Sequence, residues 1–276
     1  MRVAAVGHVE WMEFAEVEHV PKPGEIVAAR GTFRAPAGGA AVSAVQLARL
    51  AGGPGTFFTA LGDDELGHRA KQGLERLGLT VHVAWREEPT RRGFTYLDDD
   101  GERTITVIGD RLEPRASDDL PWDELAEAGA CYMTAGDVGA VRAARAAHAL
   151  VATARILPLL ADAHVELDAV VGSGSDPKER YVDGMLDPPP KLVVRTAGGR
   201  GGDWLGGEGR TGTWKAAPLP GPRADAFGCG DSFAAGLTYG LGDDRGVEGA
   251  LELAARCGAC CYTGRGPYER QLSDPS

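Results

Sequence analysis

The sequence predicts an α/β fold with a mostly parallel central sheet, helices on both faces and a small antiparallel sheet added to it. Short apolar runs alternate with helical patterns along most of the 276 residues, as in successive βαβ units. Two stretches, residues 9–34 and 91–108, break this alternation and have the patterns of strand pairs. The 40 glycines gather beside the apolar segments, where tight turns or the close approach of a ligand require them.

Continuous apolar runs mark the strands expected in the central sheet. The clearest are residues 2–7 and 191–196, and weaker runs cover residues 55–61 and 130–134. Strands that are buried on both faces of a parallel sheet read as such unbroken runs, because neither face meets water.

Five segments have helical patterns. The clearest, residues 64–77, carries leucine and alanine on one face, with Asp63 as the expected N-cap and Gly78 at the position of a C-terminal cap. Helices that lie between a sheet and other elements are apolar nearly all round, and long alanine-rich runs also favour helix. The other four expected helices cover residues 40–51, 138–156, 230–241 and 247–262.

The small sheet is expected from two separate parts of the chain. Residues 91–108 contain two runs of alternating polarity that flank Asp100 and Gly101, which predicts a hairpin. Residues 10–34, with Pro21 to Gly24 in the middle, supply two further strands. The whole chain, 1–276, then forms one domain with a small sheet that covers a site or pairs with a second chain.

Composition and charge exclude two classes of partner. With 29 Lys and Arg against 40 Asp and Glu, the net charge is −11, so we expect no binding to nucleic acid or to an anionic membrane, which needs clustered cations. No apolar run reaches the roughly 18 residues of a membrane span, and the first residues read as a buried strand rather than a secretory signal. The five cysteines, an odd and sparse set, suit a reducing compartment, so the expected location is cytoplasmic.

The sharpest motif is a Gly-x-Gly loop, Gly228 to Gly230, that opens directly into an apolar helix. Small residues allow consecutive backbone N–H groups to point at one spot, and the helix dipole adds positive charge there, so the loop can bind an anion without cationic side chains. Asp231 lies in the first turn of that helix. It is either a helix N-terminal carboxylate with a structural effect only, or a general base beside a bound phosphate.

The segment from Asp225 to Asp231 resembles the C-terminal signature of the ribokinase-like (PfkB-type) carbohydrate kinases. The resemblance extends over most of the chain and implies a three-layer α/β/α body with a β-lid formed by about 10–34 and 91–108. It also implies ATP-dependent phosphorylation of a hydroxyl on a small sugar-like acceptor, and the apolar lid favours a homodimer. The other matching elements, in the family's order, are Gly38 to Ser43, Gly62 to Gly67, the lid strands and Thr196 to Gly201.

The resemblance assigns roles in phosphoryl transfer. Asp231 corresponds to the general base that takes the proton of the acceptor hydroxyl. The backbone N–H groups of Gly228, Cys229 and Gly230 correspond to the anion hole that stabilises the transferring phosphoryl group. Asp225 stands where the family often coordinates a monovalent cation such as K⁺.

The resemblance also assigns an acceptor site, and here the sequence departs from the family. Gly38 and Gly39 would line that site together with Ser43, which replaces a frequent asparagine. The family usually has an aspartate near the N-terminus that grips two sugar hydroxyls, whereas this chain has Glu10 and then Met12. Either Glu10 takes over that grip or the acceptor is unusual.

At the nucleotide end, Thr196, Gly198 and Gly201 resemble the turn that contacts ATP. Glu179 matches the family's Asn-x-x-Glu element, which helps to hold Mg²⁺ and phosphates, although Asp176 replaces the asparagine. A solvated turn is the alternative interpretation of residues 176–179, because Asp-Pro often initiates turns.

Two alternative functions remain consistent with the sequence. A nucleoside kinase of the same family needs an apolar slot for a base, and Trp11, Met12 and Phe33 are candidates to line it. An inactive sensor of sugar or nucleotide would explain the altered positions, but Asp231 argues against it, because a pure binder gains little from a carboxylate near phosphates.

Cys229 replaces an alanine of the family's anion loop. A helix N-terminus lowers the pKa of a thiol, which would make Cys229 sensitive to oxidation, and the alternative is a small buried filler.

Overall fold

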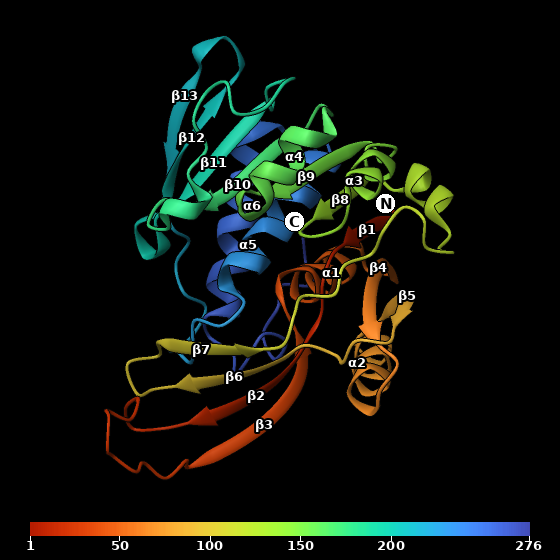
Figure 1. The fold of residues 1–276 in the computed structure, drawn as a ribbon. Coiled ribbons are helices and arrows are strands. Elements are labelled where there is room, and N and C mark those ends of the chain that lie inside the picture. Colours follow the sequence, from red (N-terminus) through yellow and green to blue (C-terminus); the bar gives the residue numbers. More distant parts are fainter.

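Two sheets organise residues 1–276, all of which are described by the computed structural model (Figure 1). The larger sheet has nine strands in the order β13-β12-β11-β10-β9-β8-β1-β4-β5. Its neighbouring strands pair in parallel, except that β12 pairs antiparallel with both β11 and β13. Its strands are β1 (Val3–Val6), β4 (Gly55–Gly62), β5 (Leu79–Arg86), β8 (Ala130–Met133), β9 (Ala149–Thr153), β10 (Ala169–Ser173), β11 (Leu192–Thr196), β12 (Gly202–Gly206) and β13 (Thr211–Trp214).

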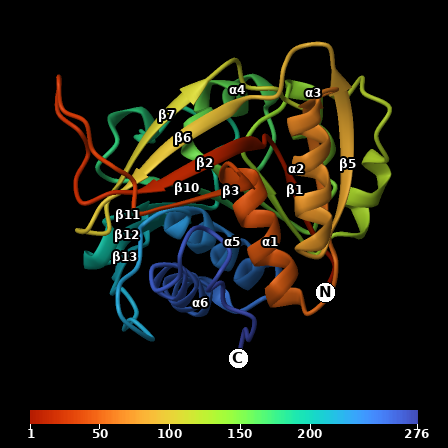
Figure 2. The ribbon, with the colours of Figure 1, turned by 90° about the horizontal axis from the view of Figure 1, so that it is seen from below.

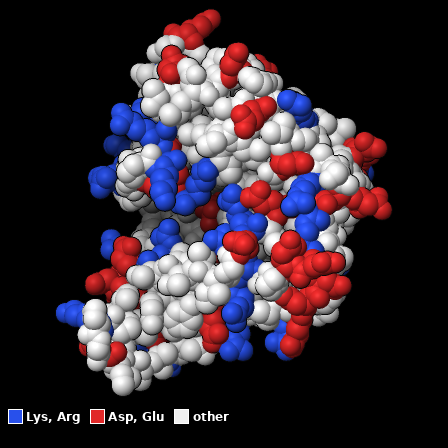
Figure 3. All heavy atoms as spheres, viewed as in Figure 1, with Lys and Arg blue, Asp and Glu red and all other residues white.

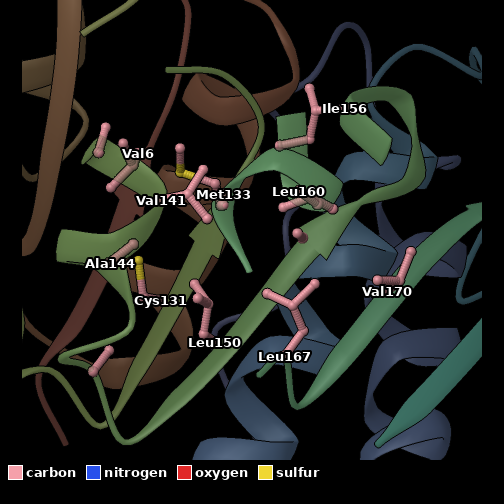
Figure 4. Packing of buried hydrophobic residues seen from close by; sticks show 14 of the residues in the cluster. Val6, Cys131, Met133, Val141, Ala144, Leu150, Ile156, Leu160, Leu167 and Val170 are labelled. Carbon is pink, nitrogen blue, oxygen red and sulfur yellow. The ribbon is translucent and has the colours of Figure 1, made fainter. Parts of the chain in front are cut away.

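Helices cover both faces of the large sheet and make three layers. One face packs against α1 (Gly39–Ala51), α2 (Glu65–Arg76), α5 (Cys229–Gly242) and α6 (Gly246–Cys261), of which α5 and α6 lie side by side (Figure 2). The other face packs against α3 (Val138–Ala144) and α4 (Leu157–Ala163). Alternate residues of β1 serve the two cores, since Ala5 faces α1 whereas Val6 joins the cluster with Met133 and Leu160 (Figure 4).

The small sheet, which we call the lid, extends from one end of the body (Figures 1 and 2). Its order is β3-β2-β6-β7, from β2 (Glu10–Glu16), β3 (Gly31–Ala37), β6 (Arg92–Leu97) and β7 (Arg103–Ile108). Each hairpin is antiparallel, and the two join through a parallel pairing of β2 with β6. Met12 and Phe14 pack against Val42 and Phe227 of the body, whereas β7 is exposed along its whole length.

Two local expectations from the sequence are wrong. Residues 138–156 do not form one helix, because α3 ends at Ala144 and β9 follows as a wholly buried strand between β8 and β10. Alanine favours helix, but pairing in the sheet and burial on both faces outweigh that preference. The N-cap of α2 is Asp64 rather than Asp63, with its carboxylate accepting the N–H of Gly67 at 2.7 Å.

The topology brings chemically important residues to one edge of the large sheet. In parallel strands the carboxyl ends share an edge, and ligands of α/β proteins bind outside it. Gly7 follows β1 and Thr134 follows β8 at the same level, because Val6 pairs with Met133. The lid rises from this edge through Glu10. No helix is long and apolar enough to cross a membrane.

Candidate active site

The surface between the lid and the body is hollowed, and lysine and arginine side chains gather along its rim (Figure 3). The glycine loop lies on this side of the body, because the lid hairpin reaches it: the N–H of Ala226 donates to the carbonyl of Gly101 at 3.0 Å. The loop's N–H groups therefore lie close to the tip of the lid.

The glycine loop has the geometry that its sequence predicts for the start of α5. Gly228 is the N-cap at φ 80°, and a Cβ there would lie 3.1 Å from both Pro267 and Val42, so a larger residue would be strained and crowded. A Cβ at Gly230, in contrast, would meet nothing within 4 Å, so the space beside this residue is open. The loop leaves room for a ligand on that side.

Asp231 directly follows this loop, in the first turn of α5. The hydroxyl of Ser43 donates to its backbone carbonyl at 2.9 Å, and a Cβ on Gly39 would lie 3.0 Å from its carboxylate Oδ1. Burial raises the pKa of Asp231, and the charge of Glu179 raises it further, whereas Arg103 and Arg155 lower it. The carboxylate forms no ion pair and no hydrogen bond within the protein, so it is free to accept a proton from a ligand.

Asp225 fixes the segment before the loop. Its two carboxylate oxygens accept the N–H of Phe227 at 2.9 Å and of Gly266 at 2.7 Å, and burial raises its pKa. Each oxygen keeps a further lone pair, so a monovalent cation fits beside it. No group of three or more histidine, cysteine or acidic side chains is arranged to hold a metal ion.

Glu10 lies with two residues that the sequence analysis missed, His8 and Arg91, at the end of the cleft where the acceptor is expected; we call it the acceptor end. Glu10 is 8% exposed, and its Oε1 lies 3.2 Å from Nη1 of Arg91 and 3.8 Å from Nε2 of His8. Burial raises the pKa of Glu10, against the opposing effect of Arg91. Burial and neighbouring arginines lower the pKa of His8 to about 3, so His8 is uncharged.

Three buried polar atoms at this end have no partner in the protein: Nδ1 of His8, Nε of Arg91 and Oγ1 of Thr134. Buried polar groups are nearly always satisfied, so atoms left over around one cleft indicate a polar ligand. The sequence carried one usable signal for them, since His8 and Thr134 follow strands whose carboxyl ends meet. Nothing in the sequence pointed to Arg91, because only the pairing register of the lid strands brings it next to Glu10.

Ser43 differs from its expected role. It is fully buried, and its hydroxyl donates to the carbonyl of Asp231, so it supports that residue from behind instead of lining the acceptor site. Gly38 and Gly39 do lie between His8 and Asp231, and a Cβ on Gly38, at φ 99°, would lie 3.2 Å from the carbonyl oxygen of His8. The sequence predicted one role for Gly38, Gly39 and Ser43, whereas in the structure only the two glycines lie between His8 and Asp231.

The three candidates for a nucleoside slot, Trp11, Met12 and Phe33, do not line one common surface. Met12 points from β2 toward the body and is fully buried. It packs so closely on Gly93 that a Cβ at this glycine would collide with it. Phe33 stacks on Phe14 with ring centroids 4.4 Å apart. Trp11 lies on the opposite face of the lid from Met12, where it packs against the α1–α2 core.

At the other end of the cleft, Glu179 is 6% exposed, which contradicts a solvated turn. Its Oε2 accepts the N–H of Ser173 at 2.7 Å, and its Oε1 pairs with Arg155, which also lies 3.7 Å from Asp176. One carboxylate alone does not hold Mg²⁺, but Mg²⁺ keeps several waters and binds through one or two carboxylates plus phosphates. Glu179 fits that supporting position.

The turn after β11 approaches Trp214 and Lys215, which line a cavity of about 450 Å³. Thr196 closes the strand, with Gly198 at φ 57° and Gly201 at φ 90° in the turn that follows. A Cβ on Gly201 would lie 2.0 Å from the carbonyl of Trp214, so only glycine fits there. The cavity is lined by Trp204, Thr213, Trp214, Lys215, Ala216, Ala217, Pro218, Glu248, Leu251, Glu252, Ala255 and Arg256.

The thiol of Cys229 is not activated. A hydrogen bond with Cys261, together with burial, raises its pKa, which opposes the effect of the helix N-terminus. The raised pKa opposes formation of a thiolate and favours the interpretation of Cys229, which is half-buried, as a small packing residue.

Comparisons with known proteins agree with this architecture. Residues 1–273 match the family described as pfkB family carbohydrate kinase. An ATP-dependent ribose-1-phosphate kinase of Halopiger xanaduensis is 28% identical over an alignment that covers 94% of this chain and 91% of the relative.

Two solved structures show the same fold. A ribokinase of Arabidopsis thaliana complexed with ribose and ATP has a TM-score of 0.74 and 18% identity, covering 99% of this chain and 96% of that one. An adenosine kinase of Sinorhizobium meliloti has a TM-score of 0.76 and 20% identity, covering 99% and 97%. The fold is thus shared by kinases of different acceptors. Because the family match spans almost the whole sequence, the chain belongs to the pfkB family of carbohydrate kinases.

Proposed function

We propose that this kinase transfers the γ-phosphoryl group of ATP to a hydroxyl of a pentose-type sugar, with Asp231 as the general base. The observation that carries the proposal is a half-buried carboxylate without any partner in the protein, at the start of α5 and beside an open glycine loop. A carboxylate in that position costs stability unless a ligand or a reaction uses it.

The reaction follows from these groups. Asp231 accepts the proton of the acceptor hydroxyl as its oxygen attacks the γ-phosphorus, and the bond from that phosphorus to the β-phosphate bridging oxygen breaks. The N–H groups of Gly228, Cys229 and Gly230 donate to the transferring oxygens, where charge accumulates. The positive charges of Arg103 and Arg155 lie within electrostatic range of Asp231 and add to this stabilisation.

The nucleotide and its ions would be held at the Glu179 end. Thr196, Gly198 and Gly201 would contact the phosphates or ribose of ATP, beside the tryptophan-lined cavity. Mg²⁺, when bound with ATP, supplies charge neutralisation on the phosphates, and Glu179 would orient its water ligands. A K⁺ ion at Asp225 would offset the burial that raises the pKa of this carboxyl.

A pentose is favoured as acceptor by two kinds of observation. The named relatives include kinases of ribose and of ribose 1-phosphate, which share a pentose ring. In this chain Glu10, His8 and Thr134 offer polar atoms where a nucleoside kinase needs an apolar slot, and Met12 and Phe33 are occupied by other contacts.

We also propose that the protein acts in the cytoplasm, on small molecules only, and that the lid pairs with a second copy. The outer strand β7 leaves Ile105, Val107 and Ile108 between 43% and 47% exposed, and an apolar strand edge of this kind is a pairing surface.

The proposed function is tested by ADP release with Mg²⁺, ATP and a panel of pentoses, hexoses and nucleosides. We expect turnover with a pentose-type acceptor and none with the Asp231→Asn variant above the rate of slow ATP hydrolysis. Turnover only with nucleosides would favour a nucleoside kinase, and tight ATP binding without turnover of any acceptor would favour the sensor.

A further inference from the structure

We propose that the acceptor already carries a phosphate group, and that the guanidinium groups of Arg91 and Arg111 bind this phosphate at the base of the lid. The inference rests on the proposed function and narrows its substrate to a monophosphorylated pentose. Neither arginine lies in a motif that pointed to the site.

The register of the lid strands places Arg91 beside Glu10. Trp11 of β2 pairs with Arg92 of β6, so the residues before them, Glu10 and Arg91, lie level on adjacent strands. Level residues point to the same face, and the two side chains approach to 3.2 Å between Nη1 and Oε1. Arg91 therefore lies at the acceptor end of the cleft, together with Glu10.

The chain brings Arg111 to the same end from the outer strand. Arg92 pairs with Ile108 of β7, so the next residue, Gly109, lies beside Arg91, and a Cβ there would be 3.9 Å from the Cα of Arg91. Arg111 follows two residues later, where the chain leaves the lid for the body. The two arginines thus flank the base of the lid.

Both arginines keep donors without a partner. The Nε of Arg91 is buried and has no hydrogen-bond acceptor. Arg111 donates through Nε to Glu113 at 2.6 Å, but neither of its terminal amino groups has an acceptor within the protein. A guanidinium carries five donors in a fixed plane, and an anion with several oxygens is the ligand that satisfies such groups together.

Their charges act on the residues that would hold the sugar. Arg91 and Arg111 both lower the pKa of His8 and of Glu10, while Asp231 raises the pKa of Glu10. These groups therefore lie within electrostatic range of one another. A pentose with its reacting hydroxyl at Asp231 directs its far end toward the arginines, and His8, being uncharged, contributes a hydrogen-bonding nitrogen there.

The surface beyond Arg111 is hollowed enough to take a phosphate and its water. A cavity of about 240 Å³ has Arg86, Arg111 and Arg115 in its wall. Arg86 is occupied by Asp118 through two bonds of 2.7 and 2.8 Å, and Nε of Arg111 is held by Glu113, so only the terminal amino groups of Arg111 are assigned to the phosphate here. The acidic residues of the wall outnumber its arginines, so the cavity supplies space beside Arg111 and is not an anion site by itself. The other lining residues are Glu88, Asp110, Leu112, Glu113 and Asp137.

The first experiment measures kcat/KM of the wild-type enzyme with Mg²⁺ and ATP on four acceptors: ribose, ribose 1-phosphate, ribose 5-phosphate and ribonate. Ribonate carries a carboxylate and separates phosphate recognition from general attraction of anions. We expect one of the two pentose phosphates to exceed ribose and ribonate by about 10- to 100-fold, the effect of one or two charged hydrogen bonds.

The second experiment compares Arg111→Gln with a matched control, Arg34→Gln. Arg34 is also a lid arginine, paired with Glu13 at 3.0 Å, but the register places it on the opposite face of the lid from Glu10. We expect Arg111→Gln to lower kcat/KM for the pentose phosphate by about 10-fold or more, and kcat/KM for ribose by a clearly smaller factor, because Arg111 also acts on Glu10 and His8. Arg34→Gln should change neither value.

The outcomes separate this inference from the proposed function. A wild-type preference for ribose or ribonate, or equal loss on ribose and pentose phosphate in Arg111→Gln, overturns the phosphate site and leaves the kinase function intact. Failure to phosphorylate any pentose overturns the proposed function. Thermal shift by the pentose phosphate without ATP then decides the site: stabilisation of wild type but not of Arg111→Gln supports it, and no stabilisation of wild type overturns it.

Discussion

The two ends of the cleft are built from different groups. The phosphoryl end consists of backbone N–H groups on a glycine loop, with Asp231 as its one reactive side chain. The proposed acceptor end consists of side chains, which are Glu10 of β2, Arg91 directly before β6, and His8 of the loop after β1. Backbone N–H groups can bind the oxygens of any phosphoryl group, whereas we propose that the side chains at the other end select the acceptor.

This difference teaches where substitutions change chemistry and where they change specificity. A chain that keeps the glycine loop keeps the ability to transfer a phosphoryl group, because the N–H groups do not depend on side-chain identity. A chain that replaces the residues around Glu10 changes its acceptor without touching that loop. Variants at the two ends should therefore separate kcat effects from effects on the KM of the acceptor.

The largest effect is expected for Asp231→Asn. Loss of the general base should lower kcat by about 10²- to 10⁴-fold, measured as ADP release at saturating ATP and acceptor. Because burial raises the folded pKa of Asp231 above its ordinary 3.8, ionisation of this group in the folded state costs stability above that pH. The variant should therefore melt no lower than wild type at pH 7, and a large loss of stability would contradict the free-carboxylate geometry.

The next effect is expected for Gly39→Ala, which changes the position of Asp231 and not its chemistry. The new Cβ would lie 3.0 Å from Oδ1 of Asp231, so the carboxylate must shift. We expect kcat to fall by about 10- to 100-fold, the effect of a small misplacement of a reacting group. Gly53→Ala is the control, because a Cβ there meets nothing within 4 Å. Equal effects of the two changes would refute the positioning role.

Glu10→Gln tests the acceptor end. Loss of the charge removes the ion pair with Arg91 and weakens the grip on acceptor hydroxyls, so the KM of the acceptor should rise by about 10-fold while kcat and the KM of ATP change little. Initial rates with each substrate varied in turn measure this. A fall in kcat with an unchanged acceptor KM would place Glu10 in the chemical step instead.

The smallest effect is expected for Cys229→Ala. The backbone N–H of residue 229 remains, and the raised pKa of the thiol indicates no catalytic thiolate, so kcat should change by less than about twofold. Mass spectrometry after alkylation of the folded protein at pH 7 should find Cys229 unmodified. Rapid alkylation, or inactivation by it, would show that the sulfur is reactive.

Much of the fold could be predicted from the sequence because its signals are local. Apolar runs gave β1 and β11, the Asp100–Gly101 turn gave the lid hairpin, and the glycine spacing gave the start of α5. The alanine-rich stretch 138–156 was wrongly predicted as one helix. Its local preference for helix does not reveal that β9 is paired with strands on both sides.

In the candidate site too, only the residues that lie close together in the sequence could be predicted from it. Asp231 and the glycine loop lie within four consecutive residues, so a motif suffices to find them. Ser43 lies in a motif as well, but its partner, the carbonyl of Asp231, is 188 positions away, and only the packing of α1 on α5 shows that its hydroxyl is already used.

The sequence by itself determined the family and located the glycine loop and the carboxylate that we propose for phosphoryl transfer, because backbone conformations that require glycine are visible as a local motif. Only the tertiary structure decided the proposed acceptor end, where the register of β2 against β6 brings Arg91 to Glu10 across 81 positions of the chain. Specific recognition depends on side chains from distant strands, and their meeting is set by strand pairing that no local pattern records.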